Sequence, residues 1–462
     1  MTNGLENFSG ELVWPDSPRY DDARSVYNQR IDMRPALVAR CRTTADVQIA
    51  LRYARANDLE VAVRSAGNNY NGFSTSDGGV VIDLGAMTDV TISPEDATAW
   101  VGGGMTGGVL LKAAEPYGLA PVTGVMCETG LGLMLGGGFG HLRNRAGWSA
   151  DQILGAELVT ADGEIVRVGT EENPDLLWAL RGAGANFGIV TALRLQLHTM
   201  PAEVVSGAMY WGEDRIAEGL RALRDVLAVA SPDFSVAGWL KAADARAVVG
   251  GPPEHLAGKR CLEITYVHWG TPEDAATAVQ ALQDAGSPDA VVPMSVTYRG
   301  LHERWKGTGA RMTWDGVSAR TLSEPVIDLL VATTRESIIP GSRRCIELFD
   351  QRGALATEPT LPSSQPRALE TAWSLRPGVS SVDPSMDEPN DRWALDFLAA
   401  VLDLEDGIPD ACGLNSTSWV PDAERVRTHY GAGTARLVEL KRTWDPENVF
   451  RKNQNIDPAW VV

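Results

Sequence analysis

The stretch Arg64-Ser65-Ala66-Gly67-Asn68-Asn69-Tyr70-Asn71-Gly72 follows the β-branched run Val61-Ala62-Val63 and consists of small, polar, turn-forming residues. Such a loop can direct consecutive backbone N–H groups at one point, which suits a phosphate or pyrophosphate. A second stretch, Gly136-Gly137-Gly138-Phe139-Gly140, lets a backbone approach a flat or anionic ligand closely, because glycine has no Cβ. Two such loops indicate a large bound cofactor rather than a single ion.

Length and composition restrict the class of protein. A chain of 462 residues with 44% hydrophobic content is too long to fold around one ordinary hydrophobic core, which predicts two domains. The net charge of −19 repels phosphate backbones, so we expect no nucleic-acid partner. No apolar run is long enough for a membrane-spanning helix, and the first residues lack the basic and apolar regions of a signal peptide. We therefore expect no membrane association.

The number and spacing of the cysteines indicate the cellular compartment and whether a metal site is expected. Five cysteines are scattered along the chain and form no CxxC pair, which is typical of reduced thiols in a cytoplasmic protein. Histidine and acidic residues show no metal-ligand spacing, so no metal site is predicted. The sequence carries no signal for the oligomeric state.

Hydrophobic periodicity predicts a mixed α+β arrangement for the first 200 residues. Strands are expected at 61–63, 80–84, 97–101 and 189–197. Helices are expected over 44–57 with Thr44 as the cap, over 106–117 ending at Gly118, and from Asn173-Pro174 to Gly182. This mixture with glycine loops suits a cofactor domain.

After residue 198 the pattern changes. Amphipathic helices are expected at 215–229 and 274–285, and strands at 262–267 and 344–349. This combination predicts a sheet with helices on one side.

The run Gly102-Gly103-Gly104-Met105-Thr106-Gly107 matches the G-x-G-x-x-G pattern of a Rossmann dinucleotide site. That pattern requires alternating βαβ units and an acidic residue at the end of the next strand. Glu128 lies at a suitable distance but within a glycine loop. A glycine-rich turn between a strand and a helix is therefore the favoured interpretation.

Several stretches together resemble the berberine-bridge-enzyme-like flavin oxidoreductases, within the wider superfamily of vanillyl-alcohol oxidase and p-cresol methylhydroxylase. The first loop is similar to the family's Arg-Ser-Gly-Gly-His-x-Tyr-x-Gly, with Ala66 at the first glycine. The stretch 129–138 is similar to the second flavin loop, and 175–191 is nearly the family signature. The C-terminal run 430–456 also matches.

The resemblance implies an altered attachment of the flavin. Asn68 stands where the family has a histidine that bonds covalently to FAD, and asparagine cannot form that bond. In Gly124-Val125-Met126-Cys127, Met126 aligns with the family's second, cysteinyl anchor and Cys127 follows one residue later. Noncovalent FAD is therefore expected, with a link through Cys127 as the alternative.

The resemblance implies an α+β fold of the p-cresol methylhydroxylase type with two domains. The predicted limits are 1–200 for the FAD-binding domain with two subdomains, 201–420 for a substrate domain of sheet backed by helices, and 421–462 for a return to the first domain. The proline- and serine-rich segment 359–391 is expected to be mostly loop, with a short strand near Ala372. Residues expected to bind FAD are Arg64, Ser65, Ala66, Gly67, Asn68, Asn69, Tyr70, Gly72, Met126, Thr129, Gly130, Gly132, Leu133, Gly136, Gly137, Gly138, Gly140, His141, Gly188, Ile189, Val190, Gln454 and Asn455.

The catalytic acid or base is left unassigned. The family's Tyr-x-Asn-Tyr stretch corresponds to 415–419, which contains no tyrosine, and its Phe-Pro-His-Arg stretch corresponds to Gln365-Pro366-Arg367, which contains no histidine. Tyr430, Glu370 and Asp350 remain as candidates.

The resemblance implies an FAD-dependent oxidase or dehydrogenase that passes a hydride to flavin N5, with molecular oxygen as the expected reoxidant. The expected substrate is a small, aromatic or polyketide-like secondary metabolite. Two alternatives stay open: a non-redox cyclase or isomerase with structural or absent FAD, and a binding module without catalysis.

Overall fold

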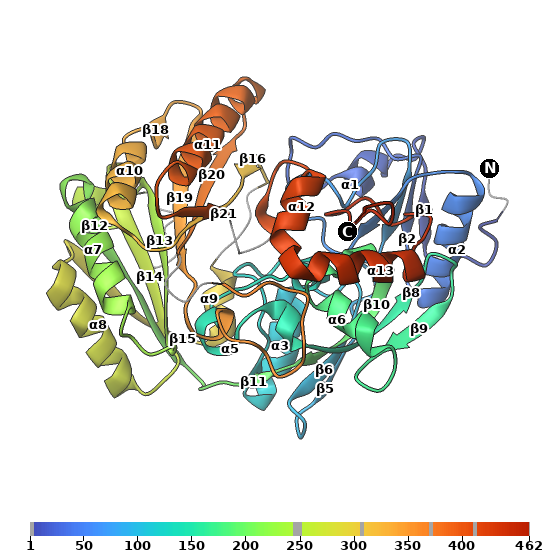
Figure 1. Ribbon diagram of the computed structural model, residues 1–462, viewed down its shortest axis with the longest axis horizontal. Helices are drawn as coiled ribbons and strands as arrows, with labels where there is room; N and C mark the ends of the chain where they lie inside the picture. The colour runs from blue at the N-terminus through green and yellow to red at the C-terminus, as the bar shows by residue number, and fades with distance from the viewer. Residues whose placement is uncertain (1–3, 244–251, 305–308, 369–372, 410–413, 462) are drawn as a thin grey trace.

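The computed structural model describes residues 4–243, 252–304, 309–368, 373–409 and 414–461. Figure 1 shows two lobes side by side. One lobe contains both chain ends, and the other contains a large sheet with helices on its outer face. The domain limits at residues 200 and 420 remain predictions.

The first sheet has the strand order β1-β2-β4-β3, with β2, β4 and β3 parallel and β1 antiparallel to β2. Strand β4 begins with three buried residues in succession, as expected of a parallel strand covered on both faces. Helix α2 is capped by Thr43, whose side chain accepts a hydrogen bond from Asp46 N–H, one residue before the predicted Thr44. The bounds are β1 Glu11–Val13, α1 Tyr20–Arg24, β2 Leu37–Arg40, α2 Thr44–Ala56, β3 Val61–Arg64 and β4 Val80–Asp83.

The second sheet is antiparallel throughout, with the order β5-β6-β10-β8-β9. The glycine run 102–107 joins β6 to α3, but a Rossmann site requires parallel βαβ units, so that hypothesis is wrong. Packing explains the glycines, because a Cβ at Gly104 would lie 1.9 Å from the Leu84 carbonyl oxygen. The bounds are β5 Val90–Ser93, β6 Thr98–Gly102, α3 Gly107–Ala114, β7 Leu119–Ala120, α4 Leu131–Leu135, α5 Arg143–Ala146, β8 Ile153–Val159, β9 Ile165–Val168, α6 Pro174–Ala183, β10 Ile189–Gln196 and β11 His198–Thr199.

The large sheet forms the second lobe, with the order β15-β12-β14-β13-β19-β20-β17-β21. Apolar side chains from its outer face pack with helices α7, α8, α10 and α11 in one core, and Figure 1 shows these helices on that side. The other face is turned toward the first lobe. The bounds are β12 Val204–Gly212, α7 Ile216–Leu227, β13 Phe234–Ala242, β14 Arg260–His268, α8 Pro272–Gly286, β15 Ala290–Val296, α9 Tyr298–Glu303, β16 Arg311–Trp314, β17 Val317–Ala319, α10 Glu324–Thr334, β18 Ile338–Ile339, β19 Ser342–Asp350, β20 Trp373–Ser381, α11 Asp387–Leu402 and β21 Gly407–Pro409.

The prediction that 359–391 is mostly loop, with a short strand near Ala372, is wrong for its second half. Ala372 itself lies outside the described residues, and a strand longer than predicted begins at Trp373. Strand β20 has nine residues and α11 begins at Asp387. Pro377 lies inside β20 but pairs with β19 on one side, while β16 and β17 pair with β20 on either side of residues 376–377. The missing proline N–H therefore falls where the outer ladder is interrupted, which is a position where a strand accepts proline.

The C-terminal helices α12 (Ala423–Tyr430) and α13 (Thr434–Trp444) return to the first lobe. Leu437 and Val438 of α13 share a buried core with Leu176 and Leu180 of α6. Figure 1 shows α13 in red beside α6. Within the described residues, every helix is too short or too polar to cross a lipid bilayer, and no group of three or more His, Cys, Asp or Glu side chains could hold a metal ion.

A buried polar network joins the two lobes. Asp350, at the end of β19, accepts hydrogen bonds from Arg143 Nη2 at 2.7 Å, Arg352 Nε at 2.7 Å and Asn144 Nδ2 at 2.8 Å. All four side chains are buried. One carboxylate thus compensates two buried guanidinium groups, and removing it would leave both without that partner.

Replacing Asp350 by Ala is expected to lower the free energy of unfolding by about 3–5 kcal/mol, because it leaves buried cations uncompensated. Urea unfolding at pH 7 measures the change. The matched control is Asp396→Ala on the exposed side of α11, expected to change stability by less than about 0.5 kcal/mol. Equal, small effects for both variants would contradict this role of Asp350.

Candidate cofactor and active site

A cavity of about 460 Å³ lies between the two lobes, within the size range of small-molecule sites. One wall comes from the two glycine loops, β3 and the C-terminal return. The opposite wall comes from the inner face of the large sheet. Residues from the sheet, β16 and the 415–416 segment that line it are Trp239, Met312, Trp314, Glu347, Phe349, Arg376, Asn415 and Ser416.

The first loop is shaped by its own side chains. Asn69 Oδ1 accepts hydrogen bonds from the backbone N–H groups of Asn71 at 3.2 Å and Phe73 at 2.9 Å. Gly67 and Gly72 have φ values of +75° and +83°, a left-handed conformation that favours glycine. These features turn the chain sharply after β3 and place residues 65–70 on the cavity wall.

The two loops are tied directly to each other. Leu131 N–H donates to Ser65 Oγ at 3.2 Å, and Asn68 Nδ2 donates to the Glu128 carbonyl oxygen at 2.7 Å. A Cβ at Gly130 would lie 2.6 Å from Ser65 Oγ, so the close approach requires glycine there. Asn68 therefore holds the two loops together from the position where the resemblance places the family's histidine.

Most residues predicted to bind FAD meet at this cavity. Those that line it are Ser65, Ala66, Gly67, Asn68, Asn69, Tyr70, Met126, Thr129, Gly130, Gly132, Leu133, Gly138, Gly188, Val190 and Gln454. Residues outside the lining are Arg64, Gly72, Gly136, Gly137, Gly140, His141, Ile189 and Asn455.

The glycines of the second loop are approached by the protein itself. A Cβ at Gly136 would lie 2.4 Å from Asn415 Oδ1, one at Gly137 2.4 Å from Gln365 Oε1, and one at Gly140 1.9 Å from the Thr123 carbonyl oxygen. In the structure, neighbouring protein groups approach these three glycines, and their contact with FAD stays a prediction. Gly138 alone of residues 136–138 reaches the cavity wall.

Arg64 and His141 lie behind the wall. The buried Arg64 guanidinium donates to Ala23 O at 2.6 Å and to Asp83 Oδ2 at 2.9 Å, which fixes the end of β3. The buried His141 ring stands edge-to-face against His302 of α9, with centroids 5.0 Å apart. Both side chains support the loops from outside the cavity.

The C-terminal return closes one end of the cavity. The fully buried Lys441 Nζ donates to Asn186 O at 2.8 Å, Asp445 Oδ2 at 2.7 Å and Phe450 O at 2.9 Å. Asn453 Nδ2 donates to Ala185 O at 2.7 Å. These bonds bring Phe450, Lys452, Asn453 and Gln454 to the lining.

Aromatic side chains from both lobes line the cavity near the first loop. The Tyr70 and Trp314 rings are stacked at 5.7 Å between centroids and 11° between planes, and Tyr27 meets Tyr70 edge-on at 6.4 Å. Asn28 fixes this arrangement, because its Nδ2 donates to Tyr70 O at 2.7 Å and to Met312 O at 3.0 Å. The result is a rigid, apolar surface suited to a flat ring system.

Three side chains form a row across the cavity face of the large sheet. Strand register sets Trp239 opposite Glu347 and Glu347 opposite Arg376, on β13, β19 and β20. Trp239 Nε1 donates to Glu347 Oε1 at 3.3 Å. This row was not predicted from the sequence, although Glu347 is a charged residue between Ile346 and Leu348, which enter the core. A charged residue within a strand of this kind was the available signal.

The Glu347 carboxylate has an unusual environment. It lies deep in the protein yet retains some accessible surface, because it faces the cavity. Burial raises the pKa of Glu347 above its ordinary value, opposed by the positive charge of Arg376 and the Trp239 hydrogen bond. A carboxyl group with a raised pKa on a cavity wall is suited to general acid–base chemistry.

The two catalytic candidates that lie within the described residues, Tyr430 and Asp350, do not line the cavity. Tyr430 is buried and its hydroxyl donates to Gly182 O at 3.1 Å, and Asp350 belongs to the network that joins the lobes. The hydrogen bonds that Tyr430 and Asp350 form with other protein groups explain why both side chains are buried away from the cavity. Glu370 lies outside the described residues.

The two possible covalent anchors differ in position. Met126 lines the cavity, and its sulfur lies 4.0 Å from the Tyr27 hydroxyl. Cys127 is not part of the lining and packs against α3, where a Cβ at Gly108 would lie 2.9 Å from Cys127 Cβ.

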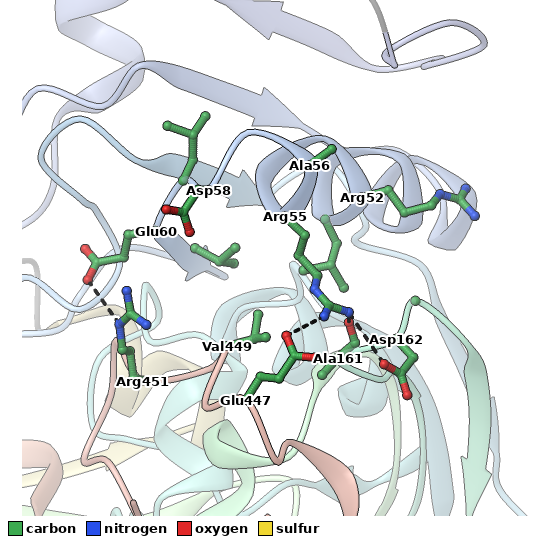
Figure 2. A pocket seen from close by; sticks show the side chains of 14 residues that line it. Arg52, Arg55, Ala56, Asp58, Glu60, Ala161, Asp162, Glu447, Val449 and Arg451 are labelled. Carbon is green, nitrogen blue, oxygen red and sulfur yellow. Dashed lines mark hydrogen bonds and ion pairs between the residues drawn. The ribbon is translucent and has the colours of Figure 1, made fainter.

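A second hollow of about 460 Å³ opens between the end of α2, the β8–β9 turn and the C-terminal return (Figure 2). Its charged side chains pair with each other across the opening: Arg55 with Glu447 at 2.7 Å and with Asp162 at 3.5 Å, and Arg451 with Glu60 at 4.0 Å. Because these charged groups already pair with one another, they offer a ligand little uncompensated charge. The interlobe cavity is therefore the candidate site.

Comparison with known proteins agrees with this geometry. A family model described as "FAD binding domain" matches residues 35–169, and one described as "Berberine and berberine like" matches residues 400–457. (R)-6-Hydroxynicotine oxidase of Paenarthrobacter nicotinovorans is 31% identical over 471 residues, covering 98% of this chain and 97% of its own. Chitooligosaccharide oxidase of Gibberella zeae is 24% identical, covering 96% and 91%.

Among solved structures, 6-hydroxy-D-nicotine oxidase from Arthrobacter nicotinovorans has a TM-score of 0.87 at 29% identity, covering 98% of both chains. Fold and cavity thus define an FAD-dependent oxidoreductase of the p-cresol methylhydroxylase type. The chain belongs to the berberine-bridge-enzyme-like family of FAD-linked oxidoreductases. The predicted family, fold class and cofactor are confirmed.

The cavity has polar groups suited to FAD. Among the described side chains, the buried Ser74 Oγ and Asn453 Oδ1 have no hydrogen-bond partner, and both residues line the cavity. The phosphates and hydroxyl groups of FAD provide acceptors for Ser74 and donors for Asn453. A Cβ at Gly132 would meet nothing within 4 Å, so space remains beside the second loop.

The histidine pair behind the second loop predicts acid sensitivity. Burial lowers the pKa of His302 from 6.5 to about 4 and holds that of His141 well below its ordinary value. A lowered histidine pKa means that stability is complete above pH 6.5 and is lost as pH falls toward 4. His302 should cost about 2 kcal/mol by pH 5.

Urea unfolding between pH 7.5 and 5 measures this loss. His302→Gln should flatten the pH dependence, whereas His255→Gln, at an exposed position, should leave it unchanged. An unaltered slope in the His302 variant would contradict the assignment.

Proposed function

We propose that the protein is an oxidase that holds FAD noncovalently and oxidises a small substrate bound against the row Trp239–Glu347–Arg376. The observation that carries this proposal is the cavity itself, which sets the glycine loops opposite a carboxyl group with a raised pKa. The named relatives act as oxidases on hydroxynicotine and chitooligosaccharides, which supports oxidation of a small molecule.

The noncovalent attachment is supported by the three residues at the anchor positions. Asn68 and Met126 line the cavity but offer no nucleophile for a bond to the flavin. Cys127 is turned toward α3. Hydrogen bonds and packing must then hold the cofactor.

When bound, FAD supplies a hydride acceptor that oxygen can regenerate. The protein provides the proton acceptor: Glu347 takes a proton from a substrate heteroatom while the hydride leaves the neighbouring carbon. Trp239 orients the carboxylate through its indole N–H. The stacked rings of Tyr70 and Trp314 favour a flat substrate, in agreement with an aromatic or polyketide-like metabolite.

A non-redox cyclase or isomerase on the same scaffold is the second candidate. The observation that favours it is the absence of tyrosine from 415–419, where Asn415 and Ser416 reach the cavity instead. Such an enzyme would convert its substrate without changing the flavin spectrum. A protein that only binds its ligand would leave both the ligand and the spectrum of oxidised FAD chemically unaltered.

Acid precipitation of the purified yellow protein should release the flavin into the supernatant and leave a colourless pellet. The physical reason is that denaturation abolishes hydrogen bonds and packing but leaves covalent bonds intact. Absorbance of both fractions near 450 nm measures the partition. A yellow pellet that becomes colourless in Cys127→Ala would show that Cys127 is the anchor after all.

Glu347→Gln should slow flavin reduction by substrate by about 10²-fold or more, because the amide cannot accept the proton. For the unaltered protein, the rate should rise with pH as Glu347 ionises. Stopped-flow bleaching without oxygen measures the rate, and Glu388→Gln on exposed α11 is the matched control. Equal rates in both variants would exclude Glu347 as the base.

A further inference from the structure

Tyr27 presents a hydroxyl group at the cavity that the oxidation proposed above does not use. The residue lines the cavity, is partly exposed, and comes from the segment between α1 and β2. Among the described residues, its hydroxyl has one hydrogen-bond contact, the Met126 sulfur at 4.0 Å. A thioether is a weak acceptor, so the phenol keeps a hydrogen-bond donor for a ligand.

The backbone around Tyr27 is fixed from both lobes. The Tyr27 N–H donates to the Gly67 carbonyl oxygen of the first loop at 3.1 Å. The neighbouring Asn28 binds the backbone of Met312 on β16 with both side-chain atoms: Oδ1 accepts from the N–H at 2.9 Å, and Nδ2 donates to the carbonyl oxygen at 3.0 Å. A side chain held in this way is positioned before a ligand arrives, which lowers the entropic cost of binding.

The Tyr27 ring belongs to the aromatic surface of the cavity. It meets Tyr70 edge-on with 65° between the ring planes, whereas Tyr70 and Trp314 are stacked at 11°. Trp314 is in turn packed against β20, because a Cβ at Gly378 would lie 2.4 Å from its ring. Tyr27 is thus inclined to the stacked rings, and its hydroxyl is available to the rim of a flat molecule that packs there.

The phenol of Tyr27 stays protonated at neutral pH. Burial raises the pKa of Tyr27 above its ordinary value, and the negative charges of Glu128 and Glu347 raise it further. The hydroxyl can therefore donate to a ligand, whereas Glu347 is the proton acceptor proposed above. The two side chains thus select different groups on one molecule: Tyr27 selects an acceptor, and Glu347 an O–H or N–H.

We propose that Tyr27 is a specificity-determining residue whose hydroxyl donates a hydrogen bond to an oxygen or nitrogen acceptor on the rim of the substrate. The substrate is then a flat molecule that carries a carbonyl, ether or ring-nitrogen acceptor in addition to the group that is oxidised. This inference rests on the proposed function only in placing the substrate against the aromatic surface. A molecule without such an acceptor would leave the Tyr27 hydroxyl unpaired in the complex, which costs affinity.

The test uses the full-length FAD-loaded protein and two probes of similar shape, acetophenone and α-methylstyrene, which carry C=O and C=CH₂ at the same place. Each is titrated while the absorbance of the bound flavin is recorded, so no turnover is needed. Tyr27→Phe removes the hydroxyl and keeps the ring. The affinity for acetophenone relative to α-methylstyrene should fall about 2- to 10-fold in this variant, as expected for one hydrogen bond between uncharged groups.

The matched control is Tyr117→Phe, at a position that is 54% exposed, which should leave the ratio of the two affinities unchanged. A ratio in Tyr27→Phe equal to that of the unaltered protein would overturn the inference. So would an unchanged ratio accompanied by weaker binding of FAD to Tyr27→Phe, measured by the fluorescence of released flavin. In that case the acceptor would belong to the cofactor and not to the substrate.

These outcomes are separable from those that bear on oxidation. A relative affinity for acetophenone that depends on Tyr27, in a protein whose flavin no substrate reduces, would contradict the oxidase and support the role of Tyr27. Flavin reduction by substrates, together with a ratio that Tyr27→Phe does not change, would contradict the role of Tyr27 alone.

Discussion

The contact between the two loops is the constraint on which the rest of the site depends. Ser65 accepts from Leu131 N–H and Asn68 donates to Glu128 O, so two segments about 60 residues apart in sequence form one wall. Gly130 makes this approach possible, because any side chain there would collide with Ser65. The resemblance places the family's covalent histidine at this position of the first loop, where Asn68 here fastens the two loops to each other. Noncovalent FAD, as proposed above, would depend on the shape that results.

The second wall depends on how the lobes are joined. Asp350 compensates Arg143 from the first lobe and Arg352 from the second, and it lies one residue beyond the cavity-lining Phe349 on β19. The buried ion network therefore holds the large sheet at a fixed distance from the glycine loops. Asn28 also joins the two walls, because its Nδ2 donates to the carbonyl oxygens of Tyr70 and Met312. Polar groups that are fully satisfied in this way rigidify the site, as an enzyme requires for positioning.

Parts of the site that consecutive residues form could be predicted from the sequence, whereas contacts between residues far apart in the sequence could not. The first loop and the 129–133 stretch were predictable, because their chemistry lies in consecutive residues. The row Trp239–Glu347–Arg376 was not, because it arises from the register of three strands far apart in sequence. Strand β20 was hidden by Pro377, which is tolerated only because the outer ladder is interrupted beside it. Asp350 and Tyr430 were considered for catalysis because their types suit it, but local sequence does not reveal that buried partners engage them.

The central claim is that FAD occupies the interlobe cavity with its ring system between the two walls. The most direct measurement is a crystal structure of the full-length protein loaded with FAD. We predict the isoalloxazine ring beside Asn68 and Met126, facing Trp239, Glu347 and Arg376, with no bond from the flavin to Cys127. A flavin ring placed elsewhere, or bonded to the protein, would contradict the account.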